Sequence, residues 1–152
     1  MSNGIDMDIW LGYFKAKVAF RSQERDFLEK IHESTHPRFE ELSKGPRETL
    51  LDNAREFLRE GMQYQLVLDG ELRLCRNEVK NCKQKNPDDP RCNELRGLCG
   101  QLHLITTQVL PYIYWKEEEF LKKILTSSEY EGLRKDIIND FLLAGKVARG
   151  EV

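Results

Sequence analysis

Four cysteines in the middle of the chain constrain its fold more than any other feature. Cys75 and Cys82 are seven positions apart, and so are Cys92 and Cys99. Seven residues bring an α-helix back to nearly the same face two turns later, so each pair marks one side of a helix. Between the pairs, the segment 86–90 reads Asn-Pro-Asp-Asp-Pro, which interrupts helical geometry. The spacing therefore predicts two helices that fold back on each other at this segment.

Two apolar seams support the same fold. Their members are spaced mainly by alternating steps of three and four residues, as in coiled-coil contacts. Folding the chain about Pro87 aligns the seams with each other and places Leu58 opposite Lys116. The first seam comprises Leu51, Ala54, Leu58, Gly61, Gln65, Leu68, Leu72, Cys75, Val79 and Cys82, and the second comprises Cys92, Leu95, Cys99, Leu102, Thr106, Val109, Ile113, Lys116, Phe120 and Ile124.

The cysteines follow this alignment and allow several interpretations. Cys82 comes opposite Cys92, and Cys75 comes opposite Cys99. Neighbouring helix axes lie about 8–10 Å apart, and facing seam residues can then reach the Cα separation of a disulfide. Two disulfides between these partners are the leading prediction. Alternatively, all four thiols are reduced and buried as small core residues, as is common for cysteine.

A metal site is a third interpretation. One zinc ion cannot bind all four cysteines, because residues seven apart on a helix are separated by about 10.5 Å along its axis and zinc–sulfur bonds are only about 2.3 Å long. Cys75 and Cys99 could instead share a zinc ion with Glu71 and His103, each of which lies four residues from one of these cysteines. His103 is otherwise interpreted as a polar residue beside the seam. Apart from this alternative, we expect no cofactor.

Helical periodicity continues on both sides of the hairpin, and no convincing alternating strand pattern is present. We expect a first helix from about Asp6 to Glu33. It should end before Pro37, because the residue preceding a proline disfavours helical geometry, and a short helical turn should follow with Phe39 and Leu42. The predicted fold class is all-α: a long antiparallel helical hairpin stapled by two disulfides and flanked by an N-terminal and a C-terminal helix.

The prolines predict where the hairpin helices begin and break. The first should run from about Pro46 to Lys85. Asp89 is suited to cap the second helix, and Pro90 is suited to its first turn. Pro111 should kink this helix or mark a local break.

The last helix is expected to begin at a capping box of Ser128 and Glu131. The chain as a whole is predicted to be a single helical domain. Its parts are an N-terminal helical arm (1–45), the hairpin (46–126) and the C-terminal helix (127–152) within residues 1–152.

Charge and hydropathy limit the partners. There are 24 Lys and Arg against 26 Asp and Glu, with a formal net charge of −2, so we expect no nucleic-acid partner, which would require a basic face. A cluster of cations is interpreted as a solvated helix face. Its members are Lys15, Lys17, Arg21 and Arg25.

No targeting or membrane-spanning segment is predicted. The first twenty residues lack the features of a secretory signal, so either a leader has been removed or the chain reaches its compartment without one. Residues 97–115 carry no formal charge and are long enough to be tested as a membrane span. Their polar residues favour a helix buried by protein. A position beside a membrane remains compatible with this interpretation.

The cysteine-bearing hairpin, residues 72–102, resembles the coiled-coil-helix-coiled-coil-helix proteins of the mitochondrial intermembrane space. In that family two helices each carry a cysteine pair, and two disulfides staple the hairpin. The resemblance implies entry without a cleavable presequence, trapping by oxidation, and a role as an accessory subunit or assembly factor of a respiratory complex. The common family pattern is twin C-x9-C, whereas here six residues separate the cysteines of each pair and nine lie between the pairs.

The residues contain no catalytic motif, so we expect no enzyme. The acidic run 117–119 is interpreted as a solvated charge run, and the three histidines, His32, His36 and His103, have no nearby nucleophile pattern. Aromatic residues are the candidates for contacts with other proteins, although core packing can also explain them. They are Tyr112, Tyr114 and Trp115 in one group and Trp10, Tyr13 and Phe14 in another.

Three functional hypotheses follow. The leading one is a non-catalytic accessory subunit of a larger protein assembly, on the intermembrane-space side of a mitochondrial respiratory-chain complex. The second is a secreted helical effector or binding protein whose leader has been cut away. The third is a cytosolic zinc-binding helical bundle that uses Cys75, Cys99, His103 and Glu71.

Overall fold

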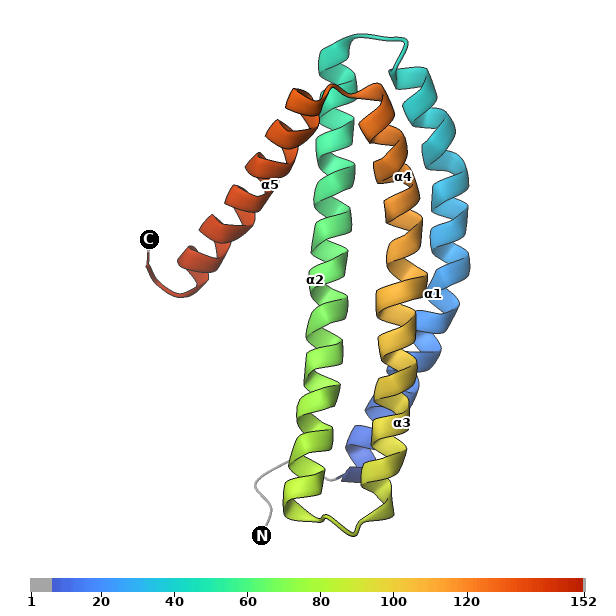
Figure 1. Ribbon diagram of the computed structural model, residues 1–152, viewed down its shortest axis with the longest axis vertical. Coiled ribbons are helices and arrows are strands. Elements are labelled where there is room, and N and C mark those ends of the chain that lie inside the picture. The colour runs from blue at the N-terminus through green and yellow to red at the C-terminus, as the bar shows by residue number, and fades with distance from the viewer. Residues whose placement is uncertain (1–6, 152) are drawn as a thin grey trace. The chain divides into compact units, whose positions relative to one another are not determined.

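The computed structural model describes residues 7–151, and within this range the protein is all-α, as predicted, with no strand. Figure 1 shows the helices in chain order. They are α1 (Met7–Leu42), α2 (Arg47–Lys85), α3 (Pro90–Leu104), the π-helical turn η1 (Ile105–Val109), α4 (Leu110–Ile124) and α5 (Ser127–Ala148). The antiparallel hairpin of the sequence prediction is formed by α2 and α3, which the two disulfides join.

The described chain divides into two compact units, each assembled from an early and a late segment. Unit 1 comprises residues 7–30 and 64–113, and unit 2 comprises residues 31–63 and 114–151. Each unit has an apolar core of its own. The core of unit 1 contains Leu11, Phe14, Leu72, Cys75, Leu95, Leu98, Cys99 and Leu102. The core of unit 2 contains Phe39, Leu50, Ala54, Leu58, Leu121, Leu125, Tyr130 and Ile137.

The predicted end of the first helix is wrong. Helix α1 continues through Pro37 to Leu42. Pro37 cannot donate a backbone hydrogen bond to the carbonyl of Glu33, but both residues are exposed, so water can satisfy that carbonyl. Continuing the helix brings Phe39, which is 2% exposed, into the core of unit 2. Burial of a large aromatic side chain outweighs the cost of one missing hydrogen bond here.

The second seam departs from the predicted positions after Thr106. At η1 the amide of Leu110 donates to the carbonyl of Ile105, five residues back, so the helix gains one residue directly before Pro111. The break expected near Pro111 therefore takes the form of a π-turn. After it, the buried positions are Leu110, Pro111, Ile113, Glu117, Leu121 and Leu125, of which only Ile113 lies on the predicted seam.

This shift corrects one predicted pairing. Lys116 was expected to lie on the seam opposite Leu58, but it is exposed, and Glu117 is buried in its place. The register has moved by one residue in α4, while the segment before η1 keeps the predicted seam.

The capping box of α5 lies two residues earlier than expected. Thr126, not Ser128, is the N-cap: its hydroxyl accepts from the amide of Glu129, and the Glu129 carboxylate accepts from the amide of Thr126. Arg47 at the start of α2 also binds this carboxylate, with Nε 2.8 Å from Oε2. The guanidinium donates further to the carbonyl of Ile124 at 3.0 Å. Arg47 thereby joins the ends of α2, α4 and α5 within unit 2.

The titration of Glu129 tests this junction. Hydrogen bonds from Arg47, and then from the amide of Thr126, lower the pKa of Glu129 from its ordinary value of 4.5 to about 2. Because the pKa of the folded state lies below that of the unfolded state, the stabilisation is complete above about pH 4.5 and is lost as the pH falls toward 2. We expect the carboxyl carbon of Glu129 to titrate near pH 2 in NMR spectra.

The variant Arg47→Gln should raise this pKa by more than about one unit. Arg25→Gln, which removes an exposed arginine of unit 1, should leave it unchanged. A value near 4.5 in the unaltered protein would contradict the junction.

Candidate functional site

Both predicted disulfides are present, and they join α2 to α3 at two levels. The Cα atoms of Cys75 and Cys99 are 5.8 Å apart, and those of Cys82 and Cys92 are 5.6 Å apart. All four cysteines are buried, and none is free. Each bridge removes about 3 kcal/mol of unfolded-chain entropy by loop closure, although nested bridges together contribute less than the sum. The predicted alignment of these two helices is confirmed here.

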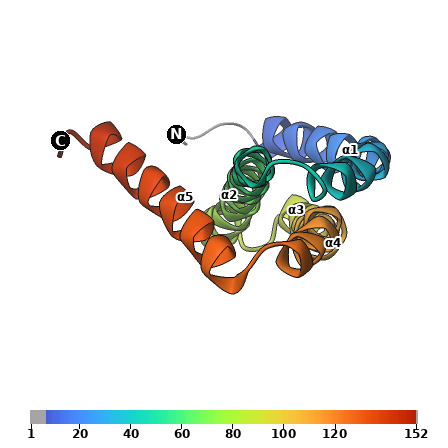
Figure 2. The same ribbon diagram turned by 90° about the horizontal axis from the view of Figure 1, so that it is seen from above.

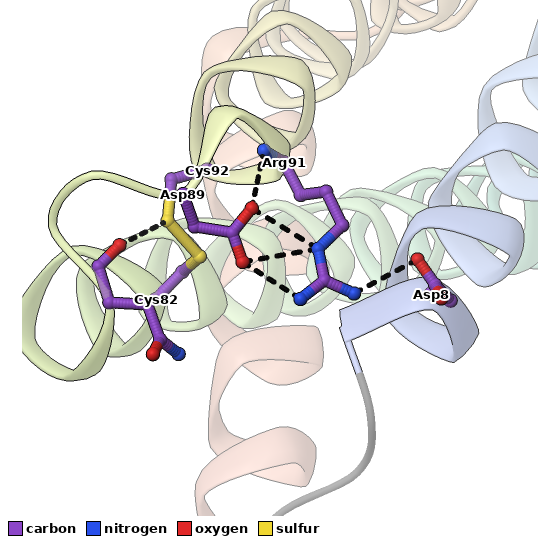
Figure 3. The surroundings of a disulfide bond; sticks show 6 residues. Asp8, Cys82, Asp89, Arg91 and Cys92 are labelled. Carbon is purple, nitrogen blue, oxygen red and sulfur yellow. Dashed lines mark hydrogen bonds and ion pairs between the residues drawn. A yellow bond between two sulfur atoms is a disulfide. The ribbon is translucent and has the colours of Figure 1, made fainter.

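The turn beside the second disulfide is held by backbone hydrogen bonds and by the side chain of Arg91. Figure 3 shows Arg91 between Asp89 and Asp8, next to the bond between Cys82 and Cys92. Asp89 is the N-cap of α3 and accepts from the amide of Arg91 at 2.9 Å, as the sequence predicted for this position. The guanidinium of Arg91 donates to both oxygens of Asp89 and, at 3.1 Å, to Asp8 of α1. Arg91 thus links the turn to α1 beside the disulfide.

Hydrogen bonds from the side chain and the backbone amide of Arg91, and then its charge, hold the pKa of Asp89 below its usual value. The sulfur of Cys92 lies 3.5 Å from the carbonyl oxygen of Asn86. This is a contact rather than a hydrogen bond, because a disulfide sulfur carries no proton.

A buried ion pair connects α1 to α2 in unit 1, and the sequence interpretation missed it. The sequence pattern predicts Arg21 on a solvated helix face, but the side chain is buried, with 6% exposure. Its Nε and Nη2 donate to the two oxygens of Glu71 at 2.9 and 2.5 Å, and its Nη1 donates to Glu24 at 2.5 Å. Tyr64 donates its hydroxyl proton to the same Glu24 carboxylate at 2.6 Å. Burial raises the pKa of Glu71, but Arg21 and Lys17 lower it by more, so the net pKa is below the usual value.

The four residues of the alternative zinc site do not converge on a metal. Cys75 and Cys99 are bonded to each other, and zinc would need their thiolates. Glu71 is occupied by Arg21, and His103 is an exposed residue 3.0 Å from Arg76. Between residues 7 and 151 no group of three or more His, Cys, Asp or Glu side chains is arranged to hold a metal ion.

Glu117 forms a buried cluster with two histidines in unit 2, which contradicts its interpretation as part of a solvated run. It is 0% exposed. Its Oε1 contacts Nδ1 of His32, and its Oε2 lies 3.4 Å from Nδ1 of His36, one turn later on α1. The ring of His36 packs on Phe120 at 4.3 Å between centroids. Neither oxygen of Glu117 receives a hydrogen bond of good geometry, so its burial is only partly compensated.

The first group of aromatic interface candidates lies near the N-terminal end of α1, in unit 1. Phe14 is fully buried and belongs to the core, so it is not part of an exposed surface. Trp10 stacks on Phe14 at 5.6 Å, and Tyr13 meets Phe14 edge-on at 4.9 Å. Tyr13 remains 39% exposed, while Trp10 is half-buried.

The second group lies at the start of α4. Tyr112 and Trp115 are 52% and 48% exposed. Tyr114 is half-buried and packs against Phe57 at 5.4 Å. It also covers Gly61, where an added Cβ would lie 3.0 Å from the tyrosine ring. Tyr114 therefore serves the packing of unit 2, and the other two side chains remain accessible.

Two apolar surfaces are exposed, and of their members the sequence analysis singled out only Tyr13 as an interface candidate. One is the outer side of α1 in unit 1, and the other is the C-terminal half of α5 in unit 2. Their exposed members are Ile9, Tyr13, Phe20 and Phe27 on α1, and Ile138, Leu142, Leu143 and Val147 on α5. Each of these helices has more apolar residues than its buried face needs. Periodicity alone therefore could not show which apolar positions the rest of the chain covers.

The chain matches no protein-family model, no curated protein and no solved structure at a significant level. Within residues 7–151, no helix combines the length and the apolar character needed to cross a membrane. The two disulfides are compatible with an oxidising compartment.

The Glu117 cluster can be tested by removing its charge. We expect Glu117→Met to raise the free energy of unfolding by about 1 kcal/mol at pH 7, because methionine fills a similar volume and needs no hydrogen bonds. Urea unfolding followed by circular dichroism measures the change.

The control is Glu119→Met, which removes an exposed carboxylate 3.1 Å from Lys122. It should change the stability by less than about 0.5 kcal/mol. If Glu117→Met instead lowers the stability by more than about 1 kcal/mol, the contacts with His32 and His36 outweigh the cost of burying the carboxylate.

Proposed function

We propose that this protein is a non-catalytic, disulfide-stapled helical subunit of a larger protein assembly, on the intermembrane-space side of a mitochondrial respiratory-chain complex. The observation that carries the proposal is the apolar surface of the C-terminal half of α5. The disulfides support the oxidising compartment, and the resemblance of the stapled hairpin to the coiled-coil-helix-coiled-coil-helix proteins supports the choice of the intermembrane space.

The exposed half of α5 is suited to a partner. Ile137 is the last buried residue of the helix, and the following turns expose Leu142 by 60%, Leu143 by 53% and Val147 by 56%. Successive helical residues point about 100° apart, so Leu142 and Leu143 face different directions. Together they form a broad apolar face, which a groove of a partner protein can cover.

The position of α5 in unit 2 supports this use. Both views show the C-terminal end of α5 directed away from the unit 2 part of α2 (Figures 1 and 2). Asp140 holds the middle of the helix through Arg55 at 3.0 Å and Arg59 at 3.6 Å. Beyond this anchor Phe141 still packs against the core of unit 2, but Leu142, Leu143 and Val147 are each more than half exposed. Exposed apolar side chains gathered in this way mark interaction sites in soluble proteins.

A second surface favours a helical partner. Tyr13, Phe20 and Phe27 follow one another at intervals of seven residues on α1, so they share one face of the helix. Their exposures are 39%, 54% and 62%. Aromatic side chains repeating at heptad spacing suit contacts with a helix laid alongside, and aromatic residues anchor many protein interfaces.

Native complex formation tests the proposal. An epitope-tagged copy expressed in the source cells should migrate with an assembly much larger than the 17.9 kDa chain and should fractionate with the intermembrane space. The double variant Leu142→Asp and Leu143→Asp should release the protein from the assembly, because two carboxylates cannot be buried there without partners. Native gel electrophoresis and affinity purification followed by mass spectrometry measure both results.

The matched control is Lys135→Asp with Lys146→Asp, which places two aspartates at exposed positions of the same helix. This variant should remain in the assembly. A wild-type protein that migrates as a monomer, or that is found in the culture medium, contradicts the proposal, and the second result favours a secreted effector.

A further inference from the structure

A pocket opens on the outer side of the disulfide-bonded hairpin in unit 1. Its volume is about 280 Å³, and it is lined by side chains of α2 and α3. Val79 and the buried Cys99 form an apolar floor, since Cys99 is 7% exposed and belongs to the core. The other lining residues are all exposed: Arg76, Arg96, Gly100 and His103. We refer to this feature as the hairpin groove.

The hairpin groove is cationic and contains no carboxylate. Among the described residues, Arg96 has no ion-pair partner, and the polar contact of Arg76 is with the ring of His103. Elsewhere in unit 1, Arg21 and Arg91 each bind carboxylates of the chain itself. Two guanidinium groups that face a pocket without an anion therefore form a local positive potential in a chain whose net charge is negative.

The neighbouring turns of α2 extend this potential. Arg73 and Lys80 lie three residues before and four residues after Arg76, so they share its side of the helix. Both are exposed, and within residues 7–151 neither is paired with a carboxylate. The cationic surface thus runs along the helix past the pocket.

The contact between Arg76 and His103 determines what the imidazole can offer. Nη2 of Arg76 lies 3.0 Å from Nδ1 of His103. A guanidinium group has only donors, so Nδ1 must accept, and the proton of the neutral ring resides on Nε2. His103 therefore holds Arg76 in position with one nitrogen and presents an N–H donor with the other.

We propose that the hairpin groove binds an acidic segment of a partner protein, with a glutamate or aspartate side chain between Arg76 and Arg96 and an adjacent apolar residue on the floor. This inference rests on the proposed function, because it specifies the chemistry of one partner contact. Guanidinium groups match the planar carboxylate and can bind it through two hydrogen bonds. The apolar floor of Val79 and the disulfide offers no donor to a phosphate ion, whereas it suits the aliphatic part of a peptide.

A peptide titration of the isolated, oxidised full chain tests the inference. The probe is an acetylated octapeptide of alternating Glu and Leu, and the comparison peptide alternates Gln and Leu. In NMR spectra of isotope-labelled protein, the Glu-containing peptide should shift the amide of Gly100 and the ring of His103 in a saturable manner, with a dissociation constant below about 1 mM. Added salt should weaken the binding, because the groove is exposed.

Variants locate the site. The double substitution Arg76→Gln and Arg96→Gln should weaken binding at least about tenfold. The control Arg25→Gln with Arg38→Gln removes two exposed arginines on α1 and should retain the affinity within about twofold. Circular dichroism and the intact oxidised mass verify that both variants are folded and bridged.

Four results overturn the inference: no shift with the Glu peptide, equal binding of the Gln peptide, equal weakening by both double variants, or displacement of the peptide by inorganic phosphate at matching concentrations. The experiment uses no cellular assembly, so its failure is distinguishable from failure of the proposed function. If the protein co-purifies with an assembly but does not bind the peptide, the proposed function stands and the proposed binding site in the hairpin groove is rejected. If the protein binds the peptide but remains monomeric in cells, the binding site in the hairpin groove stands and the proposed function is rejected.

Discussion

The two disulfides between α2 and α3 are the constraint on which unit 1 depends. With Cys75 bonded to Cys99 and Cys82 to Cys92, the helices cannot slide along each other. Leu72, Leu95 and Leu102 then share one core, and the side chains of the hairpin groove are held opposite one another. At the turn that closes the hairpin, Arg91 binds Asp89 and Asp8 beside the disulfide of Cys82 and Cys92. The disulfides and the polar contacts of Arg91 therefore stabilise the same alignment of α2 with α3.

The part of the fold that could be predicted is the hairpin, because the spacing of its cysteines and prolines is compatible with few other folds. Cysteines seven residues apart and a proline-rich break specify the hairpin, and Asp89 before Pro90 specifies its cap. The π-turn was not predictable from periodicity, because the expected and observed buried positions of α4 are adjacent apolar residues. Phe120 and Leu121 fit a buried position of the helical pattern equally well, and so do Ile124 and Leu125. Lys116 and Glu117 are both charged, so the sequence does not indicate which of the two is buried.

The buried charged residues could not be predicted from the sequence, for a different reason. A charged residue is usually solvated, and its burial becomes probable only when a partner from a distant segment is known. Arg21 and Glu71 are fifty positions apart, and Glu117 meets His32 and His36 from another helix. The same limitation applies to the candidate interfaces. Sequence pattern identified Tyr112, Trp115 and Tyr13 as contact residues, and they are exposed, but it could not identify which apolar face of α5 lacks a cover.

The proposed role divides the protein into a rigid support and surfaces that remain for partners. Disulfides reduce the need for a large core in unit 1, and therefore aromatic residues on α1 can stay at the surface. Unit 2 has no disulfide among its described residues, and it depends on apolar packing and on contacts such as that of Arg47 with Glu129. The apolar surfaces would supply affinity for a partner, while the cationic hairpin groove would supply selectivity for acidic sequences.

The connectivity of the sulfurs in protein isolated from its native source is the most direct measure of this account. Proteolysis without reductant, followed by mass spectrometry, should yield one linked pair of peptides containing Cys75 and Cys99 and another containing Cys82 and Cys92, with no free thiol. Reduced cysteines in the native protein, or any other pairing, would contradict the alignment of α2 with α3 and remove the support for an oxidising compartment.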